Sequence, residues 1–179
     1  MKQLFLWILI ALSLGIIACH PDNSPEEIEG YKPVYLTEDA RRVIKSENPR
    51  TPQQPGKIYY NTGYLYVNEI GKGVHIFDNT NPESPKNLAF INIPGNVDIA
   101  VKGNILYADN VTDLVAIDVS NPNTCKLEKR IEGLYKSPQM PDIPSTGTGG
   151  TTYFECIEPN KGTVVAWEKA TLHKPKCYR

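Results

Sequence analysis

Short apolar runs separated by turn residues dominate the chain between residues 57 and 132. Glycine and asparagine cluster in the breaks, as in Asn61-Thr62-Gly63 and Lys102-Gly103-Asn104, which is typical of hairpin connections. Segment 114–119 carries apolar residues on both faces, as expected for a strand between two other sheets. The predicted strands are 57–60, 64–68, 74–78 and 87–93, then 97–101, 105–108, 114–119 and 126–131. The pattern therefore predicts two units of four strands.

The two units are copies of one another at a spacing of about 40 residues. Asp78 and Asp118 follow equivalent strands, and each is followed by an Asn-Pro pair: Asn81-Pro82 and Asn121-Pro122. An aspartate at a strand end accepts backbone N–H bonds in a turn, and proline fixes the exit of the chain. Metal-binding or catalytic carboxylates are the alternative. Recurrence at the same point of each unit favours the structural turn.

A weaker third copy covers residues 162–168, where Glu168 replaces the aspartate and the Asn-Pro pair is missing. A period near 40 residues with several short strands per unit is typical of propeller blades. Before the repeats, Thr37 is a suitable N-cap for a short helix over 37–45. We therefore predict an all-β protein of propeller-like four-stranded repeats, about two and a half blades, with a short N-terminal helix.

Residues 114–122 read Leu-Val-Ala-Ile-Asp-Val-Ser-Asn-Pro and resemble the LVIVD repeat, and residues 74–82 are a looser copy. The resemblance covers about residues 57–132, with a degraded extension to about residue 179. It implies blade-like repeats of the kind found in bacterial surface and secreted proteins. It implies no common catalytic residue or ligand. Because a propeller needs about four or more blades, the chain resembles a short or truncated member.

The first nineteen residues resemble a bacterial lipoprotein signal. A positive start is followed by an apolar run from residue 4 to residue 17, and Ile16-Ile17-Ala18-Cys19 resembles a lipobox. The alternatives are a transmembrane helix, for which the run is short, and an ordinary thiol at Cys19. We expect lipid on Cys19 and anchoring in a membrane. His20, in place of an aspartate, favours the outer membrane, with the cell surface and the periplasmic face both open.

The predicted organisation divides the chain into six segments. They are a signal peptide (1–18), a lipidated tether (19–36), a short helix and linker (37–56), two LVIVD-like repeats (57–136), a flexible Pro/Gly/Thr loop (137–152) and a partial third repeat (153–179). Beyond Cys19, the cysteines are Cys125, Cys156 and Cys177. They allow one disulfide plus a free thiol, or three thiols. Cys156 with Cys177 is a plausible pair.

Composition and chemistry point away from catalysis. The 19 basic and 20 acidic residues are dispersed, so no nucleic-acid footprint is present. We predict no catalytic, cofactor-binding or metal-binding residues, and we assign His75 a partly buried packing role. The remaining candidates are aromatic: Tyr59, Tyr60, Tyr64 and Tyr66 fall on adjacent predicted strands. Exposed tyrosines would stack on a glycan or anchor a protein partner, whereas cross-strand packing is the alternative.

These observations predict a membrane-anchored lipoprotein that acts as a non-catalytic binding or assembly module. Its partners would be the membrane, through Cys19, and a protein, a glycan or further copies of the chain. One alternative is an incomplete propeller that needs partner chains. Another is a propeller-based cell-surface enzyme acting on glycans, which would need clustered acidic and histidine residues.

Overall fold

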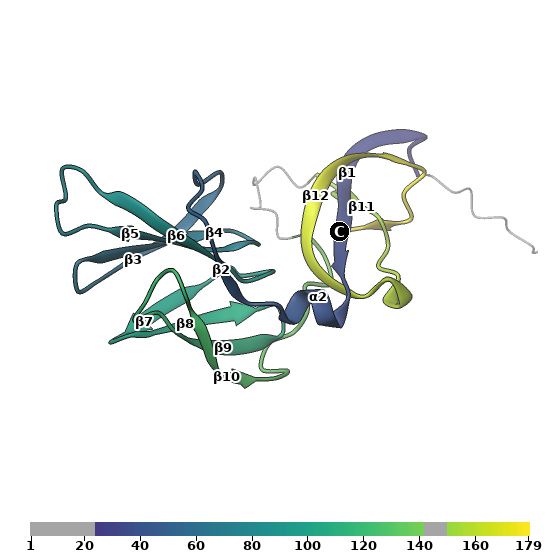
Figure 1. Cartoon of the computed structure of the whole chain (residues 1–179). Helices are drawn as coiled ribbons and strands as arrows, with labels where there is room; N and C mark the ends of the chain where they lie inside the picture. Colours follow the sequence, from purple (N-terminus) through teal and green to yellow (C-terminus); the bar gives the residue numbers. More distant parts are fainter. Residues whose placement is uncertain (1–23, 142–149) are drawn as a thin grey trace, which may run out of the picture.

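The computed structural model describes residues 24–141 and 150–179, and most of these residues lie in β-strands. The strands form three separate sheets (Figure 1). Two of the sheets correspond to the two predicted repeats. The third sheet joins the N-terminal and C-terminal parts of the described chain. The signal peptide, Cys19 and half of the predicted loop over 137–152 lie outside the described residues.

The first repeat sheet has strand order β2-β6-β5-β4-β3. Strands β3 to β6 form an antiparallel meander, and the short β2 adds to its outer edge. The second repeat sheet, β10-β9-β8-β7, is another meander of four strands. The strands are β2 (Lys45–Glu47), β3 (Pro55–Asn61), β4 (Tyr64–Glu69), β5 (Gly73–Asp78), β6 (Lys86–Asn92), β7 (Ile99–Lys102), β8 (Ile105–Asn110), β9 (Asp113–Asp118) and β10 (Lys126–Ile131). All eight predicted strands are present, with ends within two residues of those expected.

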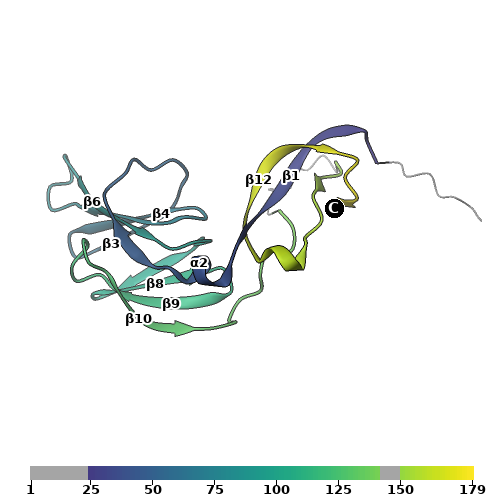
Figure 2. The same cartoon turned by 45° about the vertical axis from the view of Figure 1, so that its right-hand side comes forward.

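The main hydrophobic core lies between the two repeat sheets, which Figures 1 and 2 show one above the other. Cross-strand partners share a face of a sheet. We call the face that carries Tyr66 and its partner Ile76 the front face of the first sheet, and the face of His75 its back face. In the second sheet the front face carries Tyr107 and the back face Val115.

The front face of the first sheet packs on the back face of the second. Their buried apolar side chains form one cluster: Tyr66, Val74, Ile76 and Ile91 from the first sheet, and Ile99, Val101, Leu106, Ala108, Val115 and Ile117 from the second. The sheets are thus stacked in the same sense, front on back. This arrangement leaves the back face of the first sheet and the front face of the second sheet on the outside of the pair.

The third sheet differs from the prediction for both ends of the chain. β1 (Glu27–Leu36) pairs along its whole length with β12 (Thr163–His173), and the sheet order is β12-β1-β11-β13. The short strands are β11 (Tyr153–Phe154) and β13 (Cys177–Tyr178), with a 3-10 turn (Pro159–Lys161) between β11 and β12. The predicted tether is therefore wrong over 27–36. The predicted third repeat over 153–179 is also wrong, because β12 pairs with a distant strand and not with its chain neighbours.

Packing around β1 explains this pairing. Gly30 lies against Leu172 of β12 and the carbonyl of Tyr153, where a Cβ atom would come within 2.5 Å of both. The glycine lets β11 and β12 approach β1 from its two sides. A disulfide between Cys156 and Cys177 links β13 to the segment that follows β11, with the Cα atoms 5.3 Å apart. This is the pair that the sequence left open, and Cys125 is a free, half-buried thiol.

The predicted N-terminal helix is present as α2 (Glu38–Arg42), one turn and a half long. The hydroxyl of Thr37 accepts the backbone N–H of Ala40 at 3.3 Å, which is the expected N-cap contact. The helix joins β1 to β2 and therefore links the third sheet to the first repeat. Within residues 24–141 and 150–179, no helix has the length and apolar character needed to cross a bilayer.

Candidate functional site

The outer front face of the second repeat sheet carries the candidate site. Tyr107 of β8 lies beside Ala100 of β7 and Ala116 of β9, and Leu114 is one position further along the face. Three of the four equivalent residues of the first sheet are buried in the core: Tyr66, Val74 and Ile76. The fourth is Tyr59, the equivalent of Ala100, and it is 38% exposed. Tyr66 is 3% exposed, whereas Tyr107 is 37% exposed. We call these four residues, Ala100, Tyr107, Leu114 and Ala116, the open face. It is built like a core-forming surface but faces outward.

A pocket of about 520 Å³ lies over part of the open face. Its floor includes Tyr107 and Leu114, and its walls include Tyr135 and Pro138 from the segment after β10, and Val165 of β12. This volume falls within the range of small-molecule sites, and apolar and aromatic side chains dominate such sites. The pocket therefore accommodates apolar side chains or a ring of comparable size.

Asp109 and Asp98 lie at one side of the pocket, and both are committed to local contacts. A carboxylate oxygen of Asp109 accepts the backbone N–H groups of Val97 at 2.9 Å and Asp98 at 2.7 Å, and the amide of Asn96 at 2.9 Å. Burial nevertheless raises the pKa of Asp109 above its ordinary value. Asp98 pairs with Lys57 of β3 at 2.6 Å, a contact that lowers the pKa of Asp98. The Asp98–Lys57 pair links β3 of the first repeat to the residue just before β7.

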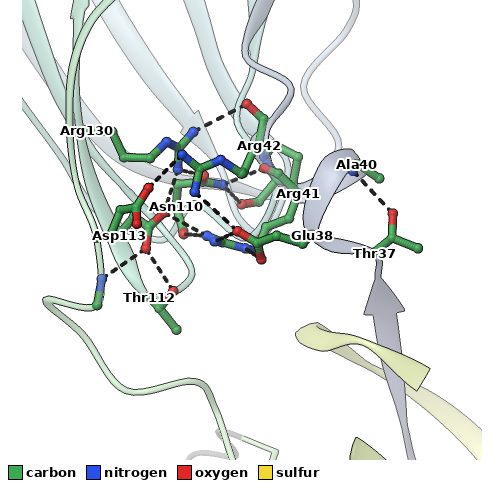
Figure 3. A network of polar contacts seen from close by, with 12 residues as sticks. Thr37, Glu38, Ala40, Arg41, Arg42, Asn110, Thr112, Asp113 and Arg130 are labelled. Atoms are coloured by element: carbon green, nitrogen blue, oxygen red, sulfur yellow. Dashed lines mark hydrogen bonds and ion pairs between the residues drawn. The ribbon is translucent and has the colours of Figure 1, made fainter. Parts of the chain in front are cut away.

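A buried network of charges fixes α2 against the second repeat sheet (Figure 3). Asp113, at the start of β9, accepts a hydrogen bond from Arg41 of α2 at 3.0 Å and another from Arg130 of β10 at 2.7 Å. The Arg41 and Asp113 side chains are only 5% and 2% exposed. Asn110 adds hydrogen bonds to the Arg41 and Pro94 carbonyls. Although burial favours the neutral acid, the contacts with Arg130 and the Gly133 N–H lower the pKa of Asp113 to about 2.

A second buried cluster covers the back face of the first repeat sheet. His75 Nε2 lies 2.7 Å from Glu69 Oε2, and the guanidinium of Arg50 sits 3.5 Å above the ring of Phe90. Burial would raise the pKa of Glu69, but hydrogen bonds from His75 and Lys72 keep it below its ordinary value. We call residues 48–54 the strap, because this segment also bonds Asn87 and Ile70 of the first repeat through its carbonyls. His75 is thus fully buried, where we expected partial burial.

The four predicted aromatic residues do not form one binding surface. Tyr66 is buried in the core, where burial raises its pKa, and Tyr64 packs half-buried against the same cluster. A ligand therefore has no access to Tyr66, and its proposed binding role is wrong. Tyr59 and Tyr60 are 38% and 61% exposed, but they alternate along β3 and so point to opposite faces.

The repeated aspartates make the same local contacts in both units. Asp78 accepts the backbone N–H of Thr80 at 2.9 Å, and Asp118 accepts that of Ser120 at 2.8 Å. Asn81 and Asn121 each accept the N–H two residues further on, and Pro82 and Pro122 follow them directly. These backbone hydrogen bonds lower the pKa of Asp78 and of Asp118. No group of three or more potential metal-ligating side chains occurs among the described residues.

Sequence reasoning missed the open face and the Asp113 network. Aligning the two repeats with a constant offset of 40 residues does not match Tyr107 with Tyr66. The reason is that the β8–β9 connection is one residue shorter than the β4–β5 connection. That offset aligns Tyr66 with Leu106, which faces the core. Aligning the repeats by the register of each hairpin, and not by a fixed offset, would have matched Tyr107 with Tyr66. Arg41 and Asp113 are 72 residues apart, so no local pattern connects them.

The fold and this face define a protein built of four-stranded β repeats. Comparison with known families identifies residues 95–131 as an LVIVD repeat, which confirms the resemblance seen in the sequence. The matched segment includes all four strands of the second repeat sheet and hence all four residues of the open face. No curated protein and no solved structure matches the chain.

Proposed function

We propose that this chain is a non-catalytic binding or assembly module, made of propeller-like repeats and anchored to a bacterial outer membrane through lipid on Cys19. The observation that carries the binding or assembly role is the open face. Tyr107, Leu114 and Ala116 correspond to side chains that the first repeat buries against a neighbouring sheet, yet Tyr107 is exposed and lines a pocket. Exposed apolar surface of this kind is typical of interaction sites.

The stacking of the two repeat sheets supports the propeller-like part of the proposal. Each sheet is a meander of four antiparallel strands, and the front of one packs on the back of the next. Propeller blades pack in this way around a common axis, and a ring needs about four or more of them. Two sheets from one chain would supply only part of such a ring.

The polar groups near the candidate site support a binding role. Asp109, which lines the pocket, forms structural hydrogen bonds inside the second repeat. Asp113 at the start of β9 and Glu69 on the back face of the first sheet are likewise held in ion pairs. The only described histidine in a repeat, His75, is fully buried against Glu69 and Phe90. Shape and apolar contact are therefore the features that the open face offers to a partner.

Lipid labelling tests the membrane anchor directly. The Cys19→Ser variant should lose incorporation of a radiolabelled or alkyne-tagged fatty acid, and the protein should leave the outer-membrane fraction. Cys125→Ser is the matched control, because Cys125 is a half-buried free thiol far along the chain. It should retain full labelling. Continued acylation of the Cys19→Ser protein would disprove the anchor, whereas it would leave the assembly role to be judged separately.

A further inference from the structure

The interface inside the chain shows what a front face binds. Tyr66, Val74 and Ile76 on the front of the first sheet are each at most 3% exposed, because the back of the second sheet covers them. The covering side chains are Ile99, Val101, Leu106, Val115 and Ile117, and none of them is more than 6% exposed. The front face of the first sheet is therefore a docking surface for the back face of another repeat.

The same kind of front face is repeated on the second sheet. By strand register, Tyr107 takes the place of Tyr66, Leu114 that of Val74, and Ala116 that of Ile76. All three are apolar or aromatic, and Ile131, which pairs with Leu114, adds an apolar side chain that is 46% exposed. This face therefore has the apolar composition needed to bind a back face. It is covered only in part, by pocket-lining residues that include Tyr135, Pro138 and Val165.

The matching back face is also present, on the other side of the pair. Ile58, Tyr60, Leu65 and Phe77 of the first sheet correspond in register to Ile99, Val101, Leu106 and Ile117 of the second. The strap covers His75 and Phe90 but leaves Ile58 and Tyr60 65% and 61% exposed. Each copy of the chain thus carries both halves of the internal interface, and each half includes exposed apolar side chains.

The side chains of the two outer faces differ in size from their inner equivalents, and the two differences compensate for each other. The outer front face has Ala116 where the inner one has Ile76, and the pocket of about 520 Å³ lies over it. The outer back face has the larger Phe77 and Tyr60 where the inner one has Ile117 and Val101. Close packing requires that large side chains face small ones or hollows. The smaller side chains of the outer front face would therefore accommodate the larger side chains of the outer back face.

We propose that a second copy of this chain docks on the open face, head to tail. The front of the second repeat sheet of one copy would pack on the back of the first repeat sheet of the next, around Tyr107 and Ile58. This inference deepens the assembly role proposed above and rests on it, but it does not require the lipid anchor. A heterologous contact of this kind either closes into a ring or continues as an open chain.

Co-purification of two tagged forms of the full chain tests the contact. The two forms are produced in the same cells, one is captured by its tag, and the recovery of the other is measured. Tyr107→Lys disrupts the outer front face, and Ile58→Lys disrupts the outer back face. Both residues are exposed, so both variants should fold. Because a lysine charge must lose water to enter an apolar contact, either substitution in both forms should reduce recovery about tenfold or more.

Mixing the two variants separates head-to-tail docking from other arrangements. A Tyr107→Lys form keeps an intact back face, and an Ile58→Lys form keeps an intact front face. Recovery should therefore return when one form carries Tyr107→Lys and the other Ile58→Lys, which also shows that both variants are folded. Tyr178→Lys is the matched control: Tyr178 is 65% exposed on the third sheet, and its substitution should leave recovery unchanged.

Three results would overturn the inference. They are no recovery with the unaltered chain, full recovery with Tyr107→Lys in both forms, and loss with Tyr107→Lys but not with Ile58→Lys. The last result would indicate two identical front faces in contact. None of these results depends on acylation, so failure of the docking model and failure of the Cys19 anchor are distinguishable.

Discussion

At the scale of single residues, Asp113 is a buried carboxylate that joins two separate elements to the start of β9. It neutralises two arginines from different elements, Arg41 and Arg130, where water has little access. Removing one partner of a buried ion pair leaves the other charge without compensation, which is more costly than removing the whole pair. Asp113 therefore contributes to the position of α2 on the second repeat, together with the hydrogen bonds between Asn110 and Arg41.

The pH dependence of stability should report on Asp113. Its pKa is about 2 in the folded protein, below the value of about 3.9 for a free aspartate. A lowered pKa stabilises the fold above the unfolded-state value, and this stabilisation is lost as the pH falls through 4 towards 2. The contribution is about 2 kcal/mol. Urea unfolding from pH 6 to pH 2 should show that Asp113→Asn loses less stability on acidification than the unaltered protein.

The exposed Asp39 of α2 provides the control for this titration. Asp39→Asn should follow the acid dependence of the unaltered protein, since its carboxylate faces solvent. Equal slopes for all three proteins would show that the buried ion pairs do not stabilise the charged form of Asp113.

At the scale of elements, the repeats are built from contacts between residues close in the sequence, whereas the third sheet depends on pairing between distant strands. Strands β3 to β10 are joined by short hairpins, and turn residues such as Gly63 and Gly103 mark their ends locally. Sequence reasoning could therefore predict them. It could not predict that β1 pairs with β12, because these strands are connected only through the whole chain. Residues 27–36 were for this reason interpreted as tether, and 163–173 as part of a third repeat.

The candidate site was only partly predictable for a related reason. The tyrosines of β3 and β4 are visible in the sequence, but which of them is buried depends on which face meets the second sheet. Tyr66 and Tyr107 hold the same position in their sheets, and only the presence of a covering sheet distinguishes them. Neither a motif nor a spacing carries that information.

The disulfide should stabilise the third sheet independently of the repeats. Cys156 and Cys177 are 21 residues apart, and closing a loop of this length contributes about 3 kcal/mol. Replacing both with serine should lower the free energy of unfolding by about that amount, followed through the fluorescence of Trp167 on β12. Trp167 packs edge-on against Phe154 of β11, so it reports on this sheet. Cys125→Ser should leave this transition within about 1 kcal/mol of the unaltered protein.

At the scale of the whole molecule, the proposed contact between copies is apolar on both sides. Tyr107, Leu114 and Ala116 would meet Ile58, Leu65 and Phe77, and no ion pair is needed at its centre. Salt screens interactions between exposed charges but does not weaken apolar contacts. Raising sodium chloride from about 0.05 M to about 0.5 M should therefore leave recovery in the two-tag experiment unchanged or increased. A fall of tenfold would indicate a contact based on charge.

The pairing of β1 with β12 also has a consequence for the order of folding. Glu27 lies opposite His173, so the first strand of the described chain has no partner until nearly all of the chain has been made. The hairpins of the two repeats close over short distances along the chain, and such contacts form early. When the chain folds, the repeats should therefore form first, while both edges of β1 remain unpaired and able to pair with another chain. The last strands to emerge complete the sheet that the first strand begins.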